Sequence, residues 1–125
     1  MAEFRVFKCK KCGKLVLQLN KAGCPNMCCG EAMTELTANT TDAATEKHVP
    51  AVERDGDLLK VTVGSVEHPM LEEHFIQFIA VTEENGFRLT YLKPGDKPYA
   101  EFKGVGPDAE VYEYCNLHGL WKTKA

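Results

Sequence analysis

Residues 111–119 have the sequence Val-Tyr-Glu-Tyr-Cys-Asn-Leu-His-Gly, a strand-like run followed by a thiol and an imidazole three positions apart. The Asn and Gly beside them favour a turned backbone. The other three histidines of the chain lie far upstream, at His48, His68 and His74. If the four imidazoles and the thiolate converge, they form a mixed nitrogen and sulfur site suited to a first-row transition metal.

The chain from about residue 46 onward has the pattern of an all-β structure. Strand-like runs lie at 58–63, 75–81, 87–92 and 111–114, and turn signals lie at Asp55-Gly56, Asn85-Gly86 and Pro94-Gly95-Asp96. Short strands at this spacing indicate a β-sandwich or a barrel. Residues 68–74 have room for one helical turn at most, and we expect no long helix.

The first 36 residues form a separate unit with two expected strands, Phe4–Phe7 and Leu15–Leu19. A unit this small buries too little apolar surface to fold without a staple, and a bound metal is the obvious one. Residues 37–45 are rich in Thr, Ala, Asn and Asp, as in a linker. We therefore expect two domains, residues 1–36 and residues 37–125.

Composition excludes several classes of protein. The chain has 125 residues and a formal net charge of −3, with no basic stripe, so nucleic acid is not an expected partner. No apolar run approaches the roughly 18 residues that a membrane span needs, and the opening stretch lacks an apolar signal core. We expect a cytoplasmic protein, in which six cysteines indicate metal or redox chemistry before disulfides.

Five of the six cysteines crowd the first 29 residues. Cys9-x-x-Cys12 is a turn in which two thiolates can reach one ion, whereas Cys28 and Cys29 are adjacent. Neighbouring side chains on a strand point to opposite faces, so the vicinal pair requires a sharp bend, which Gly30 would favour. The spacing predicts a distorted four-sulfur site for iron or zinc. It leaves Cys24 as a spare thiol, a substitute ligand or a labile redox thiol.

The histidine site has two alternative interpretations. A β-sandwich with a late Cys and His is typical of blue-copper proteins, but no Met follows His118 as a weak axial ligand, and four histidines are too many. Alternatively, the cysteines hold structural zinc and the histidines are unrelated. Met70 is a soft candidate ligand and better explained as a core side chain.

Four neutral imidazoles and one thiolate leave an octahedral metal with one open position. A thiolate opposite that position donates electron density along the axis and favours metal oxidation. An iron(II) ion in such a site could pass one electron to a small oxidant.

At this point the chain resembles the desulfoferrodoxin family, the two-iron form of superoxide reductase, over essentially its whole length. The motifs that carry the resemblance are Cys9-x-x-Cys12 with Cys28-Cys29, Glu46-Lys47-His48-Val49-Pro50, His68-Pro69-Met70 with His74, and Cys115-Asn116-x-His118-Gly119-x-Trp121. The resemblance implies a desulforedoxin-like domain followed by an immunoglobulin-like β-sandwich. It implies reduction of superoxide to hydrogen peroxide, and hence superoxide detoxification, with an external electron donor such as rubredoxin, and a homodimer.

The resemblance also implies roles for individual residues. The rubredoxin-type iron would be held by Cys9, Cys12, Cys28 and Cys29. The catalytic iron would have His48, His68, His74 and His118 as equatorial ligands and Cys115 as the axial one. Glu46 would be a sixth ligand to ferric iron after product leaves. Lys47 would attract the anionic substrate and support proton delivery through water.

Overall fold

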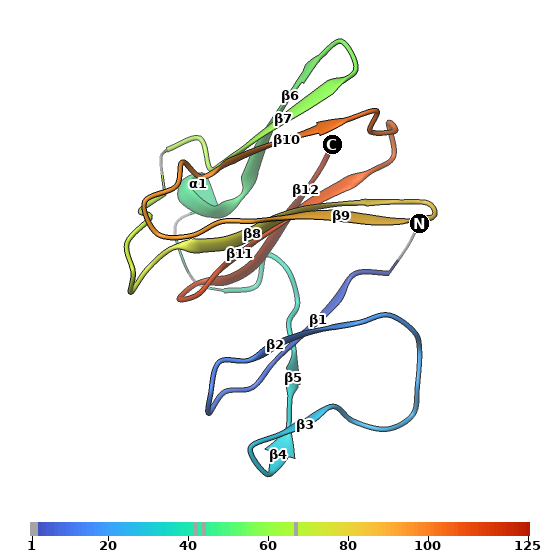
Figure 1. Cartoon of the computed structure of the whole chain (residues 1–125), viewed down its shortest axis with the longest axis vertical. Helices are drawn as coiled ribbons and strands as arrows, with labels where there is room; N and C mark the ends of the chain where they lie inside the picture. The colour runs from blue at the N-terminus through green and yellow to red at the C-terminus, as the bar shows by residue number, and fades with distance from the viewer. Residues whose placement is uncertain (1–2, 42, 44, 67) are drawn as a thin grey trace. The chain divides into compact units, whose positions relative to one another are not determined.

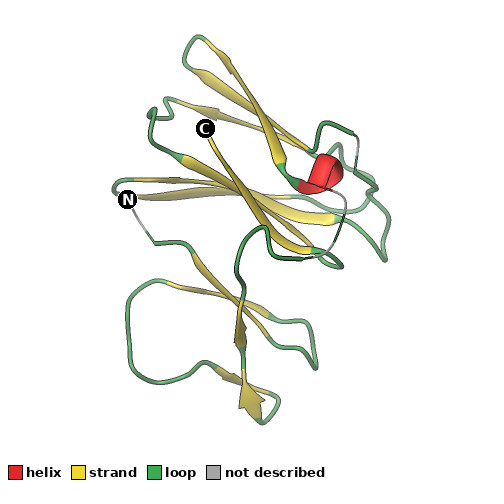
Figure 2. Cartoon of the chain, turned by 180° about the vertical axis from the view of Figure 1, so that it is seen from behind, coloured by secondary structure: helices red, strands yellow, loops and turns green. Residues whose placement is uncertain are grey.

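The computed structural model describes residues 3–41, 43, 45–66 and 68–125, and the side chain of Glu46 lies outside what it describes. The contacts divide the chain into two compact units, Glu3–Thr37 and Ala38–Ala125. Apart from one helical turn the described structure is all β, as predicted (Figures 1 and 2). None of the helical structure in the described residues has the length and apolar character needed to cross a membrane.

The smaller unit contains a three-stranded antiparallel sheet and a short hairpin. The sheet has the order β2-β1-β5, built from β1 (Arg5–Lys8), β2 (Leu15–Gln18) and β5 (Thr34–Glu35). The hairpin pairs β3 (Met27–Cys28) with β4 (Glu31–Ala32). The hydrophobic cluster of the smaller unit consists of Phe7, Cys9 and Met33, with Val16 and Cys28 packed against it. Two of these five side chains are thiols, so Cys9 and Cys28 form part of the core itself.

In its described residues the larger unit is an antiparallel sandwich of seven strands. One sheet has the order β10-β7-β6, from β6 (Pro50–Asp55), β7 (Leu58–Val63) and β10 (Tyr99–Lys103). The other has the order β12-β11-β8-β9, from β8 (Ile76–Glu83), β9 (Gly86–Tyr91), β11 (Glu110–Cys115) and β12 (Gly119–Lys124). Sheets of three and four strands agree with the expected immunoglobulin-like sandwich (Figure 1).

The core of the sandwich lies between these two sheets. Buried residues alternate with half-buried ones along β7, where Leu59, Val61 and Val63 are fully buried. The facing sheet contributes Ile79 and Val111 to the same cluster. The strand predicted at 58–63 and the hairpin turn at Asn85-Gly86 are therefore confirmed, and each follows from local pattern alone.

The stretch between the two units differs from the linker that its composition predicted. The backbone N–H of Asn39 donates to Leu120 O (3.0 Å), and its side-chain amide bonds both the carbonyl and the N–H of Lys122 (3.2 and 2.9 Å). This segment is thereby fixed along β12. It leads to α1 (Thr45–His48), a single helical turn that the sequence analysis did not predict. Residues 71–74 form a turn closed by a bridge between Leu71 and His74.

Candidate metal centres

Four cysteine thiols meet in the smaller unit. The Sγ atoms of Cys9, Cys12, Cys28 and Cys29 all lie within 4.8 Å of one another. Cys12 Sγ is 3.6 Å from Cys28 Sγ, and Cys28 Sγ is 3.9 Å from Cys29 Sγ. These are the four thiols that the sequence analysis selected, and the spacing of their sulfurs fits one tetrahedrally coordinated ion.

The adjacent pair converges because the backbone reverses between its members. Cys29 has φ of 51° and Gly30 has φ of 77°, both in the left-handed region. This is the sharp bend that two neighbouring ligands require, and a non-glycine residue adopts it only at some cost in strain. On the other side of the cluster, the N–H of Gly13 donates to Cys9 O (2.9 Å) and closes the first turn.

Without a cation the four thiols cannot all ionise. Hydrogen bonding from the backbone at Cys12 lowers the pKa of Cys9 to about 6. Hydrogen bonds among the side chains, led by that with Cys12, raise the pKa of Cys29 to about 12 and also raise that of Cys28. Cys9 therefore forms a thiolate readily, whereas Cys29 keeps its proton at neutral pH. A cation is needed to make all four sulfurs ligands. Cys24 is exposed and is not a member of this cluster.

A second cluster lies in the larger unit and joins residues up to 70 positions apart. One ligand atom from each of His48, His68, His74, Cys115 and His118 lies within 4.8 Å of all the others. His48 ends α1, His74 closes the turn before β8, and Cys115 and His118 flank the turn between β11 and β12. All five residues predicted for this site are brought together. This convergence argues against the alternative in which the histidines are unrelated to one another.

The imidazole rings face a common centre. Neighbouring rings are nearly perpendicular, with interplanar angles of 77–83° and centroids 4.6–4.9 Å apart. His48 Nε2 lies 2.9 Å from His118 Nδ1 and 3.1 Å from His68 Nε2, while Cys115 Sγ lies 3.8 Å from His118 Nδ1. His74 Nε2 is buried with no hydrogen-bond partner among the described residues. One metal ion would give His74 Nε2 a partner and would lie between the ring nitrogens that are now close to one another. The donor set therefore fits the iron that the family resemblance implies.

Burial keeps His68 and His74 in the neutral form that ligates metal. His48 and His68 are each 2% exposed. Desolvation lowers the pKa of His68 to about 4, and it also lowers the pKa of His74. Both imidazoles are therefore unprotonated at neutral pH and free to donate a lone pair.

The surroundings of the cluster fix the ligands in place. Trp121 stacks on His48 (5.2 Å, 26°) and donates from Nε1 to His118 O (2.9 Å), which connects two ligands through one buried side chain. His68 Nδ1 lies 2.7 Å from Pro69 O. The pairing of β11 with β8 shifts register between Tyr114 and Cys115, and such irregularities re-aim a side chain at a strand end. Met70 is half-buried against the sandwich core, as its core interpretation predicted.

Lys47 directly precedes the ligand His48 and is exposed. Its positive charge is among the influences that lower the pKa of His74, so its field reaches the cluster. The other residue assigned to catalysis, Glu46, has its side chain outside the described part of the structure.

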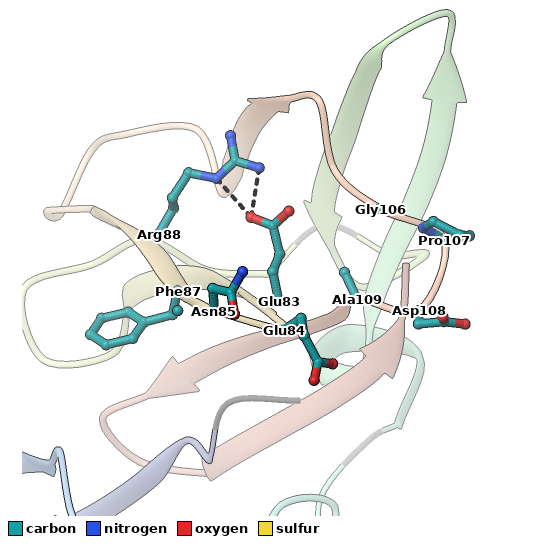
Figure 3. A pocket seen from close by; sticks show the side chains of 10 residues that line it. Glu83, Glu84, Asn85, Phe87, Arg88, Gly106, Pro107, Asp108 and Ala109 are labelled. Atoms are coloured by element: carbon teal, nitrogen blue, oxygen red, sulfur yellow. Dashed lines mark hydrogen bonds and ion pairs between the residues drawn. The ribbon is translucent and has the colours of Figure 1, made fainter.

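A separate hollow lies beside the β8–β9 turn, where Glu83, Glu84 and Asp108 give it an acidic lining (Figure 3). The Glu83 carboxylate accepts two hydrogen bonds from Arg88 (3.1 and 2.9 Å), which offsets part of that charge. The lining residues include neither His nor Cys. This hollow therefore lacks the ligands of a redox metal site, and the two clusters above are the candidate centres.

Comparison with known proteins agrees with this geometry. The family model described as Desulfoferrodoxin matches residues 40–124. The chain belongs to the desulfoferrodoxin family. It is 47% identical to a desulfoferrodoxin of Syntrophotalea carbinolica, with 99% of each chain covered, and 44% identical to one of Nitratidesulfovibrio vulgaris, with 98% of each covered. The resemblance inferred from the motifs is thus confirmed.

Solved structures similar to this desulfoferrodoxin-family chain include superoxide reductases. That of Treponema pallidum is 37% identical with a TM-score of 0.77, and the match covers 98% of this chain and 99% of that one. The one-iron superoxide reductase of Giardia intestinalis is 30% identical with a TM-score of 0.56, covering 64% of this chain and 97% of that one. The four-cysteine and the histidine–cysteine clusters fit the two iron centres of desulfoferrodoxin.

Proposed function

We propose that this protein is a superoxide reductase, which converts superoxide to hydrogen peroxide at the histidine–cysteine centre. The observation that carries the proposal is the convergence of four imidazoles and one thiol on a single point, in a chain similar to solved superoxide reductases. Iron held there would supply the one electron that, with two protons, converts superoxide to hydrogen peroxide, and an external donor would restore that electron.

The residues of the chain perform three tasks in this reaction. The imidazoles of His48, His68, His74 and His118 would hold the metal as donors that add no charge. Cys115 supplies the one anionic donor, and because it is fully buried its sulfur is shielded from water and oxidants. Lys47, exposed beside the cluster, attracts the superoxide anion and supports proton delivery from solvent through water bound at Nζ. Glu46 would serve as a sixth ligand to the oxidised metal once product has left.

We further propose a separate role for each of the two domains. Residues 1–36 form a desulforedoxin-like domain whose four cysteines hold a rubredoxin-type iron, and residues 37–125 form the catalytic domain. The electron donor is a rubredoxin-like protein, the molecule is a cytoplasmic homodimer, and its role is superoxide detoxification by electron transport. The fit of the two clusters to iron supports the assignment of one iron to each domain.

Anaerobic purification with iron counting, followed by pulse radiolysis of the reduced protein, tests the proposal. We expect two irons per chain and rapid oxidation of the second by superoxide, with a thiolate absorption that appears on oxidation. Replacing His118 by Ala or Cys115 by Ser should remove one iron and the reaction, while Cys12→Ser should affect the other iron alone. Copper at the second centre, or iron content unchanged in His118→Ala, would contradict the proposal.

A further inference from the structure

Asn116 connects the two segments that supply ligands on one side of the second centre. It follows the ligand Cys115, and its side chain reaches the segment around His74. Phe75 N–H donates to Asn116 Oδ1 (2.9 Å), and Asn116 Nδ2 donates to Glu73 O (3.1 Å). The backbone N–H of Asn116 also donates to Phe75 O (3.2 Å). Three hydrogen bonds therefore hold the two residues that flank His74.

His74 depends on its backbone for its position more than His48 and His68 do. His48 is stacked on Trp121, and His68 has Pro69 O 2.7 Å from its Nδ1. No side-chain hydrogen bond joins the His74 ring to another described residue, and the ring is only half-buried. Apart from its contacts with the rings of His68 and His118, the orientation of His74 therefore depends on the peptide to which it is attached.

The turn that carries His74 is closed mainly on itself. Leu71 N–H donates to His74 O (2.8 Å), and His74 N–H donates to Leu71 O (3.1 Å). These bonds fix the shape of the turn but not its distance from Cys115 and His118. The pairing of Cys115 with Ile76 and the backbone bond from Asn116 to Phe75 bring the turn close to those ligands. The side-chain amide of Asn116 adds a bond on each side of His74, to Glu73 and to Phe75.

The chemistry of asparagine suits this position. One side-chain oxygen accepts and one nitrogen donates, so the group pairs with the N–H of one residue and the carbonyl of another as a neighbouring strand would. Aspartate retains the acceptor but loses the donor, and it places a negative charge against Glu73 O. Alanine loses both bonds.

We propose that Asn116 is a positioning residue, which holds His74 at the distance and orientation required for iron binding at the second centre. The proposal rests on the proposed function only in taking iron as the metal that the cluster holds. It concerns the affinity of the centre, which can be measured without superoxide.

The test compares iron(II) binding by the full chain and by Asn116→Ala and Asn116→Asp, using anaerobic competition with a chelator. The four-cysteine centre serves as an internal reference. Removing a residue that orients a ligand typically weakens metal binding by about 10- to 100-fold, and we expect a loss in this range for Asn116→Ala. Asn116→Asp should lie between this variant and the wild type. The thiolate absorption of the oxidised second centre should shift in both variants.

Arg54→Ala is the matched control. Arg54 also makes two side-chain bonds to a neighbouring backbone, to Val105 O (2.6 Å) and Gly106 O (2.8 Å). Arg54 lies four residues along β6 from Pro50, the first residue of the strand that follows the ligand His48. At the usual rise of a strand this is about 13 Å, so Arg54 is remote from the end of the strand nearest that ligand. A general loss of stability would be similar in this variant, but we expect its iron affinity to change by less than about twofold.

A double-mutant cycle with His74→Ala shows whether Asn116 acts through this ligand. In the His74→Ala background, Asn116→Ala should weaken iron binding by less than about twofold further. Wild-type affinity in Asn116→Ala, or the same fold-loss in both backgrounds, would overturn the proposal. A wild-type protein that binds both irons but does not react with superoxide would instead overturn the proposed function and leave the role of Asn116 intact.

Discussion

Glu113 is a buried acid whose replacement should stabilise the protein. It lies on β11 between Ile79 of β8 and Trp121 of β12, and it is 0% exposed. Neither carboxyl oxygen has a hydrogen-bond partner among the described residues. Burial raises the pKa of this carboxyl well above its ordinary value. The folded state therefore carries the cost of a desolvated polar group that leucine would not impose.

The size of the effect follows from this environment. Leaving a buried polar group unsatisfied costs about 1–3 kcal/mol, and an apolar side chain of similar shape avoids that cost. With an m-value of about 3 kcal/mol/M, typical of a small domain in guanidinium chloride, Glu113→Leu should raise the midpoint of unfolding by roughly 0.3–1 M. The gain is limited to the larger unit, in which β11 lies.

Denaturation of the iron-loaded protein, followed by the fluorescence of Trp121, measures this change. Trp121 is the single tryptophan of the chain and lies in the larger unit. Glu53→Leu makes the same chemical change on an exposed position of β6 and should alter stability by less than about 0.5 kcal/mol. A lower midpoint for Glu113→Leu than for the wild type would refute the reasoning, since it would mean that the carboxyl group is well paired in solution.

Three further outcomes are expected. A unit charge about 7 Å from the substrate contributes ~0.6 kcal/mol in water and ~2.4 kcal/mol at an effective dielectric of 20, so Lys47→Gln should slow oxidation by superoxide by about 3- to 50-fold. Stopped-flow or pulse-radiolysis rates should show this difference at low salt and its decline at high salt; equal rates at low salt would count against steering. The bond from Tyr99 to Glu101 (2.7 Å) raises the pKa of Tyr99 to about 12 because ionisation would set two negative charges together. Glu101→Gln should therefore lower this pKa towards its ordinary value, as NMR of ring-labelled tyrosine would report, whereas an unchanged pKa would exclude the carboxylate as its cause. Chelation of the first metal should abolish amide-exchange protection in residues 3–37 and leave the larger unit protected; retained protection would show that the small unit folds without metal.

Features encoded by local spacing were predictable from the sequence. The Cys9-x-x-Cys12 turn and the 58–63 strand depend on neighbours a few positions away, and the structure confirms both. In contrast, β6 was not predicted because its burial does not alternate and four of its six residues are exposed. The helical turn α1 is four residues long, too short to produce a periodic pattern.

The residues that support the second centre were harder to identify than its ligands. Asn39 and Asn116 each occur in stretches whose composition indicates a linker or a turn, and both residues are common there. Their actual roles depend on partners 83 and 41–43 positions away. Glu113 was equally hidden, because nothing in a strand-like run distinguishes a buried acid from an exposed one. Trp121 could have been identified from the sequence, because it belongs to the motif that carries the family resemblance. The sequence analysis nevertheless assigned it no role.

The two centres differ in how metal binding and folding depend on each other. In the smaller unit the four ligands lie within 21 positions, and two of them form part of a hydrophobic cluster of only a few side chains. Metal binding there supplies folding energy that the chain lacks, so the metal shapes the unit. In the larger unit the ligands come from α1, two loops and a strand end, around a core that buries Leu59, Val61, Ile79 and Val111 completely. Cys115 is the one ligand that belongs to this cluster, and the other core side chains are apolar, so the fold can bring the imidazoles together at close range. Imidazoles preorganised in this way can ligate iron in both of its oxidation states. A site that gives up one electron in each cycle requires this.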